Sequence, residues 1–421
     1  MRKTKLIIAL ASSLACSIAA ADTVFFSTQA RPLEEAQGMR EMVLKGFDEP
    51  VQFLPQEDGP FFARIEAEEQ AGEGSLGLLG ALHGDFPPIE SALDSVNDLT
   101  PLLTEAGVSA GYSKLGKLGG QDQKYIPWMQ ATYIMAANKK ALQYLPEGAD
   151  INTLTYDQLL AWGQNIKQET GEAKLGFPAG PKGLIHRFLQ GYLYPSYTNS
   201  VVTEFRSDKA KQMWASFKDI WAVSNPRSTA YSFMQEPLLS DEVWVAFDHT
   251  ARLKDAFDKR PDDFVAFPAP AGPEGRGYMP VVAGLAIPAN TPDRAASVRL
   301  INYLMQPETQ IATLRATSFF PTVSVDFPDD LPHSVRISGA AVSTQANSED
   351  AILSLLPIGL GDNSGLFSKI YQDTFQQIVL RNADIDGILD RQASQLERLM
   401  KEAGAPCWSP DLPSEGACPV K

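Results

Sequence analysis

The sequence is poor in the residues that metalloproteins and many enzymes use for chemistry. It has three cysteines and four histidines in 421 residues. No two histidines are spaced as H-x-x-x-H or H-E-x-x-H, so a zinc hydrolase is unsupported. The G-x-S-x-G motif and the GxxxxGK[ST] phosphate loop are also missing, and Gly72 to Gly80 does not match a dinucleotide fingerprint. We therefore expect no catalytic residue, no metal and no cofactor.

Basic residues are scarce as well. The 36 Lys and Arg residues stand against 51 Asp and Glu, for a formal net charge of -15. Nucleic-acid binding needs clustered Lys and Arg to neutralise phosphates, so we expect no nucleic-acid partner. The length and the hydrophobic content of 44% are those of a soluble globular protein of two or three domains.

The first 21 residues are typical of a secretory signal peptide. A basic start precedes an apolar stretch over 6–18 and three alanines that end at Ala21, which predicts export and cleavage after Ala21. The apolar stretch is shorter than the roughly 20 residues of a membrane-spanning helix. Cys16 leaves a lipoprotein anchor open, although residues 13–15 fit a lipobox poorly. Cleavage removes three positive charges, so the mature net charge becomes -18.

Removal of the signal leaves two cysteines, Cys407 and Cys418, in a tail rich in Pro, Ser and Gly. An even pair in an exported protein predicts a disulfide. In the chain-entropy model a loop of this size contributes on the order of 3 kcal/mol. We expect this bridge to hold the tail in place.

Short apolar runs alternate with amphipathic stretches. This βαβα order predicts an α/β fold with a mainly parallel sheet covered on both faces. The pattern predicts strands at 23–27, 51–54, 76–79, 243–247, 264–267 and 281–287, and early helices at 33–45 and 61–70. Further on, Thr155 and Gln158 predict a capping box, and Thr291-Pro292 predicts an N-cap followed by the first helical residue. Two α/β units without a linker indicate lobes joined by crossing strands.

The segment 124–140, KYIPWMQATYIMAANKK, combines a Tyr-x-Pro step, an apolar strand and an Asn-Lys pair. It resembles the segment of periplasmic sugar-binding proteins of ABC importers in which the chain first crosses between lobes. Thr155 to Leu159 is similar to the family's Thr-Trp-x-Glu-Leu helix start, with Tyr and Gln as departures. The strand at 281–287 and the stretch 291–307 resemble the family's return strand and the helix after it. By this order of pieces the chain is identified as a member of the maltose-binding type of extracellular solute-binding protein.

The resemblance implies a type II periplasmic binding protein, which has two Rossmann-like lobes joined by crossing hinge segments. We expect an N-terminal lobe of 22–128 plus 284–335 and a C-terminal lobe of 129–283 plus 336–421. A cleft between such lobes closes on its ligand by hinge motion. The resemblance further implies a periplasmic protein that delivers a carbohydrate-like solute to the membrane subunits of an ABC permease. We expect it to be a monomer.

Candidate ligand contacts follow from the rule that ligands of open α/β sheets lie beyond the carboxyl ends of strands. A sugar offers apolar ring faces and a rim of hydroxyls, which suit aromatic side chains and planar polar groups. The candidates after predicted strands or in the crossing segment are Gln29, Arg31, His83, Asp85, Trp128, Gln130, Asp248 and Arg252. Structural roles stay open: a turn cap for Asp85, hinge packing for Trp128, and a mutual ion pair for the last two. His83 has the alternative of an ordinary surface histidine.

Two glycine-containing loops add candidates. The loop 176–182 precedes a stretch that contains Tyr194, and the resemblance implies aromatic contacts from this second lobe. The loop 359–365 contains Asp362, which either faces the cleft or belongs to a flexible surface loop. The family's tryptophan after the strand that ends here at Phe247 is absent. This departure favours a disaccharide or small glycoside over a long maltodextrin.

Two competing functions remain open. An exported glycoside-active enzyme needs two carboxylates at a defined separation, which a sequence alone does not place. A binding protein for a polyamine or a metal complex would suit an acidic cleft.

Overall fold

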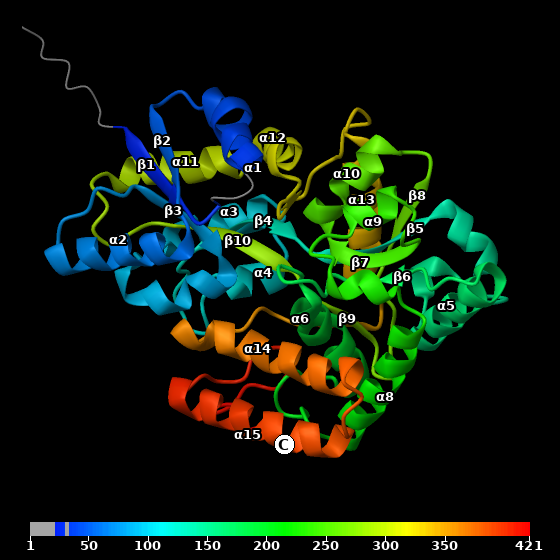
Figure 1. Cartoon of the computed structure of the whole chain (residues 1–421). Helices are drawn as coiled ribbons and strands as arrows, with labels where there is room; N and C mark the ends of the chain where they lie inside the picture. The colour runs from blue at the N-terminus through cyan, green and yellow to red at the C-terminus, as the bar shows by residue number, and fades with distance from the viewer. Residues whose placement is uncertain (1–21, 30–32) are drawn as a thin grey trace, which may run out of the picture.

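The computed structural model describes residues 22–29 and 33–421, apart from the side chains of Glu34 and Asp362. The chain forms two α/β lobes, each around its own sheet (Figure 1). The predicted signal peptide at 1–21 lies outside the described residues. None of the helices in the described ranges combines the length and apolar character that a membrane crossing requires.

The first lobe is built on a six-stranded sheet with the order β11-β4-β10-β3-β1-β2. Strand β1 runs parallel to β2 and β3, whereas β10 runs antiparallel to β3 and β4, and β11 antiparallel to β4. The prediction of a mainly parallel sheet is therefore wrong, because β4 leaves this lobe and β10 re-enters it in the opposite direction. The strands are β1 Thr23–Ser27, β2 Val51–Pro55, β3 Leu78–Leu82, β4 Ile126–Ala131, β10 Val281–Ala286 and β11 Phe320–Pro321.

The predicted strand at 76–79 overlaps β3 only at Leu78 and Leu79. The strand continues to Leu82, paired with β1 and β10. Phe25 of β1 covers Gly80 so closely that a Cβ there would lie 2.7 Å from its ring, which explains a glycine within this strand. The helices of this lobe are α1 Leu33–Gly38, which continues through a π-helical segment and a 3₁₀ turn to Gly46, α2 Asp58–Ala71, α3 Thr100–Glu105, α4 Ala110–Leu115, α11 Arg294–Leu304 and α12 Pro307–Thr317.

Helix α11 begins two residues later than Thr291-Pro292 predicts. Its N-cap is Asp293, whose side chain accepts a hydrogen bond from the Ala296 N–H at 3.0 Å. Asp is among the strongest N-cap residues, and here it provides the cap that the sequence assigns to Thr291.

The second lobe contains a four-stranded sheet with the order β6-β7-β5-β8, in which β5 runs antiparallel to β7 and β8. Its strands are β5 Tyr133–Asn138, β6 Leu175–Gly176, β7 Val245–His249 and β8 Phe264–Phe267, and a separate parallel pair joins β9 Arg276–Tyr278 to β12 Ala351–Leu353. Its helices are α5 Tyr156–Thr170, α6 Ile185–Phe188, α7 Tyr194–Thr198, α8 Asp208–Ala222, α9 Gln235–Leu239, α10 Thr250–Lys259, α13 His333–Ala346, α14 Ser364–Phe375 and α15 Ile385–Ala403. The capping box of α5 is confirmed, with Thr155 and Gln158 each bonding the other's backbone N–H.

The chain crosses between the sheets at Thr132 and returns just before β10. The Thr132 hydroxyl donates to the Met279 carbonyl at 2.8 Å, so the two crossing segments are tied together. Helix α13 packs against β8 and α10, which puts a third crossing between β11 and α13. We therefore propose lobe boundaries at 132, 279–280 and 322–332, near those expected after 128, 283 and 335.

The second lobe has a large continuous core that extends to the end of the chain. The predicted disulfide between Cys407 and Cys418 is confirmed, and both cysteines are buried in this core. The tail therefore packs as an integral part of the lobe.

Candidate ligand-binding cavity

A cavity of about 860 Å³ lies between the two lobes. Its first-lobe wall is formed by α2, which follows β2, and by the turn at 82–89, which follows β3; its second-lobe wall consists of Arg187, the segment 356–361 and α14. In Figure 1, α14 lies below α2. The cavity thus adjoins the carboxyl ends of β2 and β3, where the rule for α/β sheets places ligands. Its volume falls within the range of small-molecule sites, about 300–1,000 Å³.

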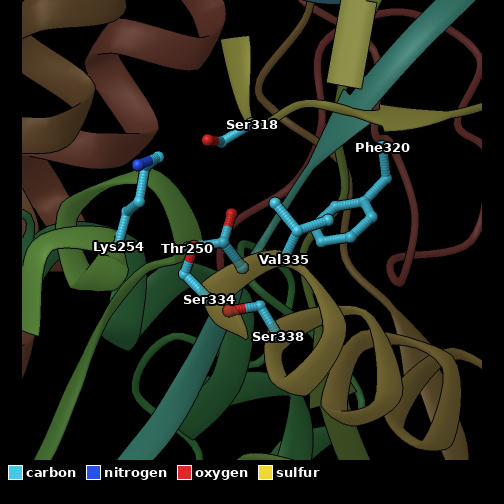
Figure 2. A pocket seen from close by; sticks show the side chains of 7 residues that line it. All are labelled: Thr250, Lys254, Ser318, Phe320, Ser334, Val335 and Ser338. Carbon is cyan, nitrogen blue, oxygen red and sulfur yellow. The ribbon is translucent and has the colours of Figure 1, made fainter. Parts of the chain in front are cut away.

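A second hollow lies where the end of α12 meets α10 and α13 (Figure 2). Its volume is about 10 Å³, and its lining residues are Thr250, Lys254, Ser318, Phe320, Ser334, Val335 and Ser338. That volume is roughly the room that one water molecule needs. The interlobe cavity is therefore the candidate site for a solute.

Asp85 lines the cavity, as the strand-end rule predicts. Its carboxylate accepts a hydrogen bond from the Leu82 N–H at 3.0 Å, so it also caps its own turn. Burial, with the nearby charge of Asp58, raises the pKa of Asp85 to about 6, although the Leu82 N–H, Thr28 and the charge of Arg187 act in the opposite direction. Near that pH the carboxyl group is able both to accept and to donate hydrogen bonds to a hydroxylated solute.

Arg187 is the cationic side chain that sequence reasoning missed. It is half-buried, comes from the short helix α6 and lines the cavity on the second-lobe side. It makes no ion pair with a side chain in the described ranges, and its Nη1 is 3.5 Å from Oε1 of Gln190. A half-buried guanidinium without a carboxylate partner retains donors for a ligand. The sequence signal for it was only its position beside His186, in the stretch after the loop 176–182.

His83 is buried beside the cavity rather than lining it. Its neighbours in the chain, Leu82 and Gly84, line the cavity. The Nδ1 atom of His83 is 2.7 Å from the hydroxyl of Tyr125. Its role in the structure is therefore a buried hydrogen bond to Tyr125, and the alternative of a surface histidine is wrong because only 4% of the residue is exposed.

Asp248 lies near the end of strand β7 and Arg252 in the first turn of α10, and neither is among the described residues that line the cavity. The fully buried Asp248 carboxylate accepts hydrogen bonds from the backbone N–H groups of Met234 and His249, both at 2.8 Å. Burial raises the pKa of Asp248 to about 6, against the charge of Arg252. The Arg252 guanidinium donates to the carbonyls of Lys182 and Ser232, at 3.3 and 3.2 Å. The two side chains thus fix loops around the end of β7, without the mutual ion pair considered above.

The two aromatic candidates are core residues. Trp128 packs against Phe25 in the first lobe, with ring centroids 5.8 Å apart. Tyr194 is fully buried in the second lobe, where its hydroxyl donates to the Phe205 carbonyl at 3.1 Å and accepts from Trp214 at 3.0 Å. Neither residue lines the cavity.

The other candidates lie elsewhere or outside the described residues. Gln130 contacts the Tyr112 hydroxyl and donates to the Pro321 carbonyl at 3.3 Å, near the first crossing. Gln29 donates to Glu35 at 3.0 Å. Arg31 lies outside the described residues. The backbone of Asp362 belongs to the turn Gly361–Asn363 at the cavity edge, but its side chain lies outside the described part.

Acidification is expected to destabilise the protein. Burial lowers the pKa of His83 to about 4 and those of His186 and His249 to about 3. A histidine held neutral in the folded state favours folding above its usual pKa of 6.5 and loses that contribution as the pH falls toward its folded value. Asp85 and Asp248, with pKa values raised to about 6, act in the opposite sense, because their contribution is gained as the pH falls from 6 toward 4.

The three histidines have the larger shifts and are expected to outweigh the two carboxyls. Thermal unfolding followed by circular dichroism should therefore give a lower Tm at pH 4.5 than at pH 7. A Tm that is unchanged or higher at pH 4.5 would contradict this account of the buried histidines.

Comparison with known proteins gives a match to a family model and many solved structures with a similar fold. Residues 50–329 match the family model described as bacterial extracellular solute-binding protein. No curated protein sequence matches the chain. Solved structures that are similar include maltose-bound MalE3 of T. maritima, with a TM-score of 0.69, 16% identity, and coverage of 90% of this chain and 99% of that one.

Two further solved structures are similar over nearly their whole length. UgpB from Mycobacterium tuberculosis, in complex with glycerophosphocholine, has a TM-score of 0.69 at 16% identity. The match covers 91% of this chain and 99% of the UgpB chain. The sugar-binding protein MalE from Xanthomonas citri has a TM-score of 0.70 at 14% identity. The match covers 90% of this chain and 97% of the MalE chain. At these identities the likeness is one of fold.

Proposed function

Because the chain belongs to the family of bacterial extracellular solute-binding proteins, we propose that it captures a carbohydrate-like solute for an ABC importer. The predicted α/β fold of two lobes, that of the type II periplasmic binding proteins, is confirmed by the solved structures of the same fold. We place the solute, a disaccharide or small glycoside, in the cavity between the lobes.

The observation that carries the proposal is the composition of this cavity. Polar groups enter it from both lobes, with Asp85 on one side and Arg187 on the other. Planar charged groups of this kind bind the hydroxyl rim of a sugar through charge-assisted hydrogen bonds. Among the described lining residues Phe62 is the single aromatic side chain. One aromatic ring supports one stacked sugar ring better than a long chain of them, and hence a small ligand.

The similar structures support the same class of ligand. Their bound ligands are maltose, glycerophosphocholine and, for the GacH receptor of Streptomyces glaucescens, acarbose. We propose that the two lobes close on the solute around the crossing segments, and that the closed monomer docks on the permease in the periplasm after cleavage of the signal peptide. We assign no catalytic step to the cavity, so the solute leaves it unchanged.

Isothermal titration tests the proposal. The mature protein, freed of co-purified ligand, is titrated with mono- and disaccharides, glucosylglycerol and glycerol phosphates. We expect saturable 1:1 binding of at least one of them, and recovery of that compound intact after long incubation. The absence of saturable binding across the panel would contradict the carbohydrate proposal, and a hydrolysed product would instead indicate an enzyme.

One observation favours a second candidate, a polyamine. Four carboxylates line the described part of the cavity against one guanidinium, namely Asp58, Glu66, Glu69 and Asp85. An acidic wall attracts a cation. A thermal-shift screen with spermidine, with ferric citrate as the metal-complex comparison, would separate this candidate from the sugars. Stabilisation by spermidine together with no response to any sugar would favour it.

A further inference from the structure

The second-lobe wall of the cavity has little secondary structure of its own. Leu356, Pro357, Gly359 and Leu360 line the cavity from an irregular segment between strand β12 and the turn at 361–363. Such a segment has no strand or helix ladder to fix its position, so its shape depends on what packs behind it.

The C-terminal tail packs behind this wall. The Leu355 N–H donates to the Ser409 carbonyl at 2.9 Å, and the Ser409 hydroxyl donates to the Leu353 carbonyl at 2.6 Å. The tail also faces Gly359, where a side-chain Cβ would come within 3.4 Å of Ala405 and of Pro406. Leu356 and Leu360 belong to the same apolar core as the two bridged cysteines.

The tail, residues 405–421, has no helix or strand and is fixed by three sets of interactions. The Cys407–Cys418 disulfide closes it, and the Cys418 N–H donates to the Ala405 carbonyl at 2.8 Å. The Asp411 carboxylate accepts the backbone N–H groups of residues 201–203. The N–H of the last residue, Lys421, donates to the Thr203 carbonyl at 3.1 Å, and its carbonyl accepts from the Arg206 N–H at 3.0 Å. The tail is therefore fixed to the rest of the second lobe on one side and packs against the cavity wall on the other.

We infer that the disulfide-closed tail, residues 405–421, positions the cavity wall at 356–361 and thereby sets the affinity for the solute. The bridge fixes the tail, Ser409 holds Leu353 and Leu355 just before the wall, and Ala405 lies against Gly359 within it. The wall in turn presents its surface to the cavity. Opening the bridge enlarges the ensemble of wall conformations, and only a fraction of that ensemble binds.

Hydrogen exchange of the protein without solute tests the inference directly. In the double variant Cys407→Ser/Cys418→Ser, amides of 354–361 are expected to exchange about tenfold faster or more, while the first-lobe strands keep their protection. Exchange in 354–361 that stays unchanged, while the tail itself exchanges faster, would overturn the inference.

Two single variants test the same inference in a protein that keeps its bridge. Ser409→Ala removes the hydrogen bond from the tail to the Leu353 carbonyl, at the end of β12 and just before the wall. Ser414→Ala makes the same change inside the tail, where its hydroxyl accepts the Cys407 N–H at 2.9 Å. We expect faster exchange of 354–361 in Ser409→Ala and not in Ser414→Ala. Equal behaviour of the two variants would count against the tail as the support of the wall.

The predicted effect of the tail on solute affinity rests on the proposed function. With the solute that titration identifies, the double variant is expected to bind about five- to tenfold more weakly. An unchanged Kd with faster wall exchange would overturn the claim on affinity. If no solute of the panel binds, the proposed function fails while the exchange experiment still decides whether the tail supports the wall.

Discussion

Asp411→Ala is expected to lower the free energy of unfolding by about 3–5 kcal/mol, an exceptional loss for one side chain. The Asp411 side chain is buried, and its oxygens accept the N–H groups of Val201, Val202 and Thr203 at 2.8–2.9 Å. It also accepts the hydroxyls of Ser200 and Thr203. Alanine leaves three backbone donors without a partner inside the protein, each at a cost of about 1–3 kcal/mol.

The measurement is equilibrium unfolding in urea, followed by tryptophan fluorescence without added solute. Asp411→Asn keeps the shape but has one acceptor oxygen in place of two, so it is expected to lose about 2 kcal/mol. The matched control is Asp390→Ala, because Asp390 is an exposed carboxylate of the same lobe that pairs with Arg206 at 3.3 Å. That loss should stay below about 1 kcal/mol. A loss in Asp411→Ala no larger than in the control would refute the role of this carboxylate.

What the sequence predicts well depends on short-range chemistry. The capping box of α5 lies within four residues, and the structure contains it. Asp85 is found for a similar reason, since it lies in the turn after β3 and accepts from the N–H of Leu82, the strand's last residue, three positions back. The disulfide follows from export and an even cysteine count, which need no knowledge of the fold.

Contacts between distant segments are not predictable in this way. Asp411 bonds residues more than 200 positions earlier, and nothing near either segment signals the pairing. Arg187 lies on a four-residue helix, too short to show a periodic pattern. Trp128 lies in strand β4, which is buried on both faces, so the alternation of residues does not tell core from cavity. Tyr194 begins the five-residue helix α7, which is buried all round and too short to show a polar face. The sequence therefore predicts the lobes and one wall of the cavity, but not the residue that faces it.

Arg187→Ala is expected to weaken solute binding by about 10- to 100-fold. The guanidinium lines the cavity from the second lobe, opposite Asp85, and has no ion-pair partner among the described side chains. Hydrogen bonds to a charged group contribute roughly 1.5–3 kcal/mol, which corresponds to this range of affinities. Arg187→Lys keeps the charge but loses the fork of donors, so we expect an intermediate loss. Titration calorimetry with the identified solute gives the Kd of each variant.

Arg252→Ala is the informative contrast, because the sequence pointed to Arg252 and the structure points to Arg187. The Arg252 guanidinium is already engaged with the carbonyls of Lys182 and Ser232 and lies over the ring of Phe233 at 4.5 Å. Its loss should lower stability and leave the Kd within about twofold, since its donors are used inside the lobe. If the Kd is unchanged in Arg187→Ala but the affinity falls strongly in Arg252→Ala, the solute binds at the end of β7 and not in the cavity beside α2. The pair of variants therefore decides which end of the second lobe holds the solute.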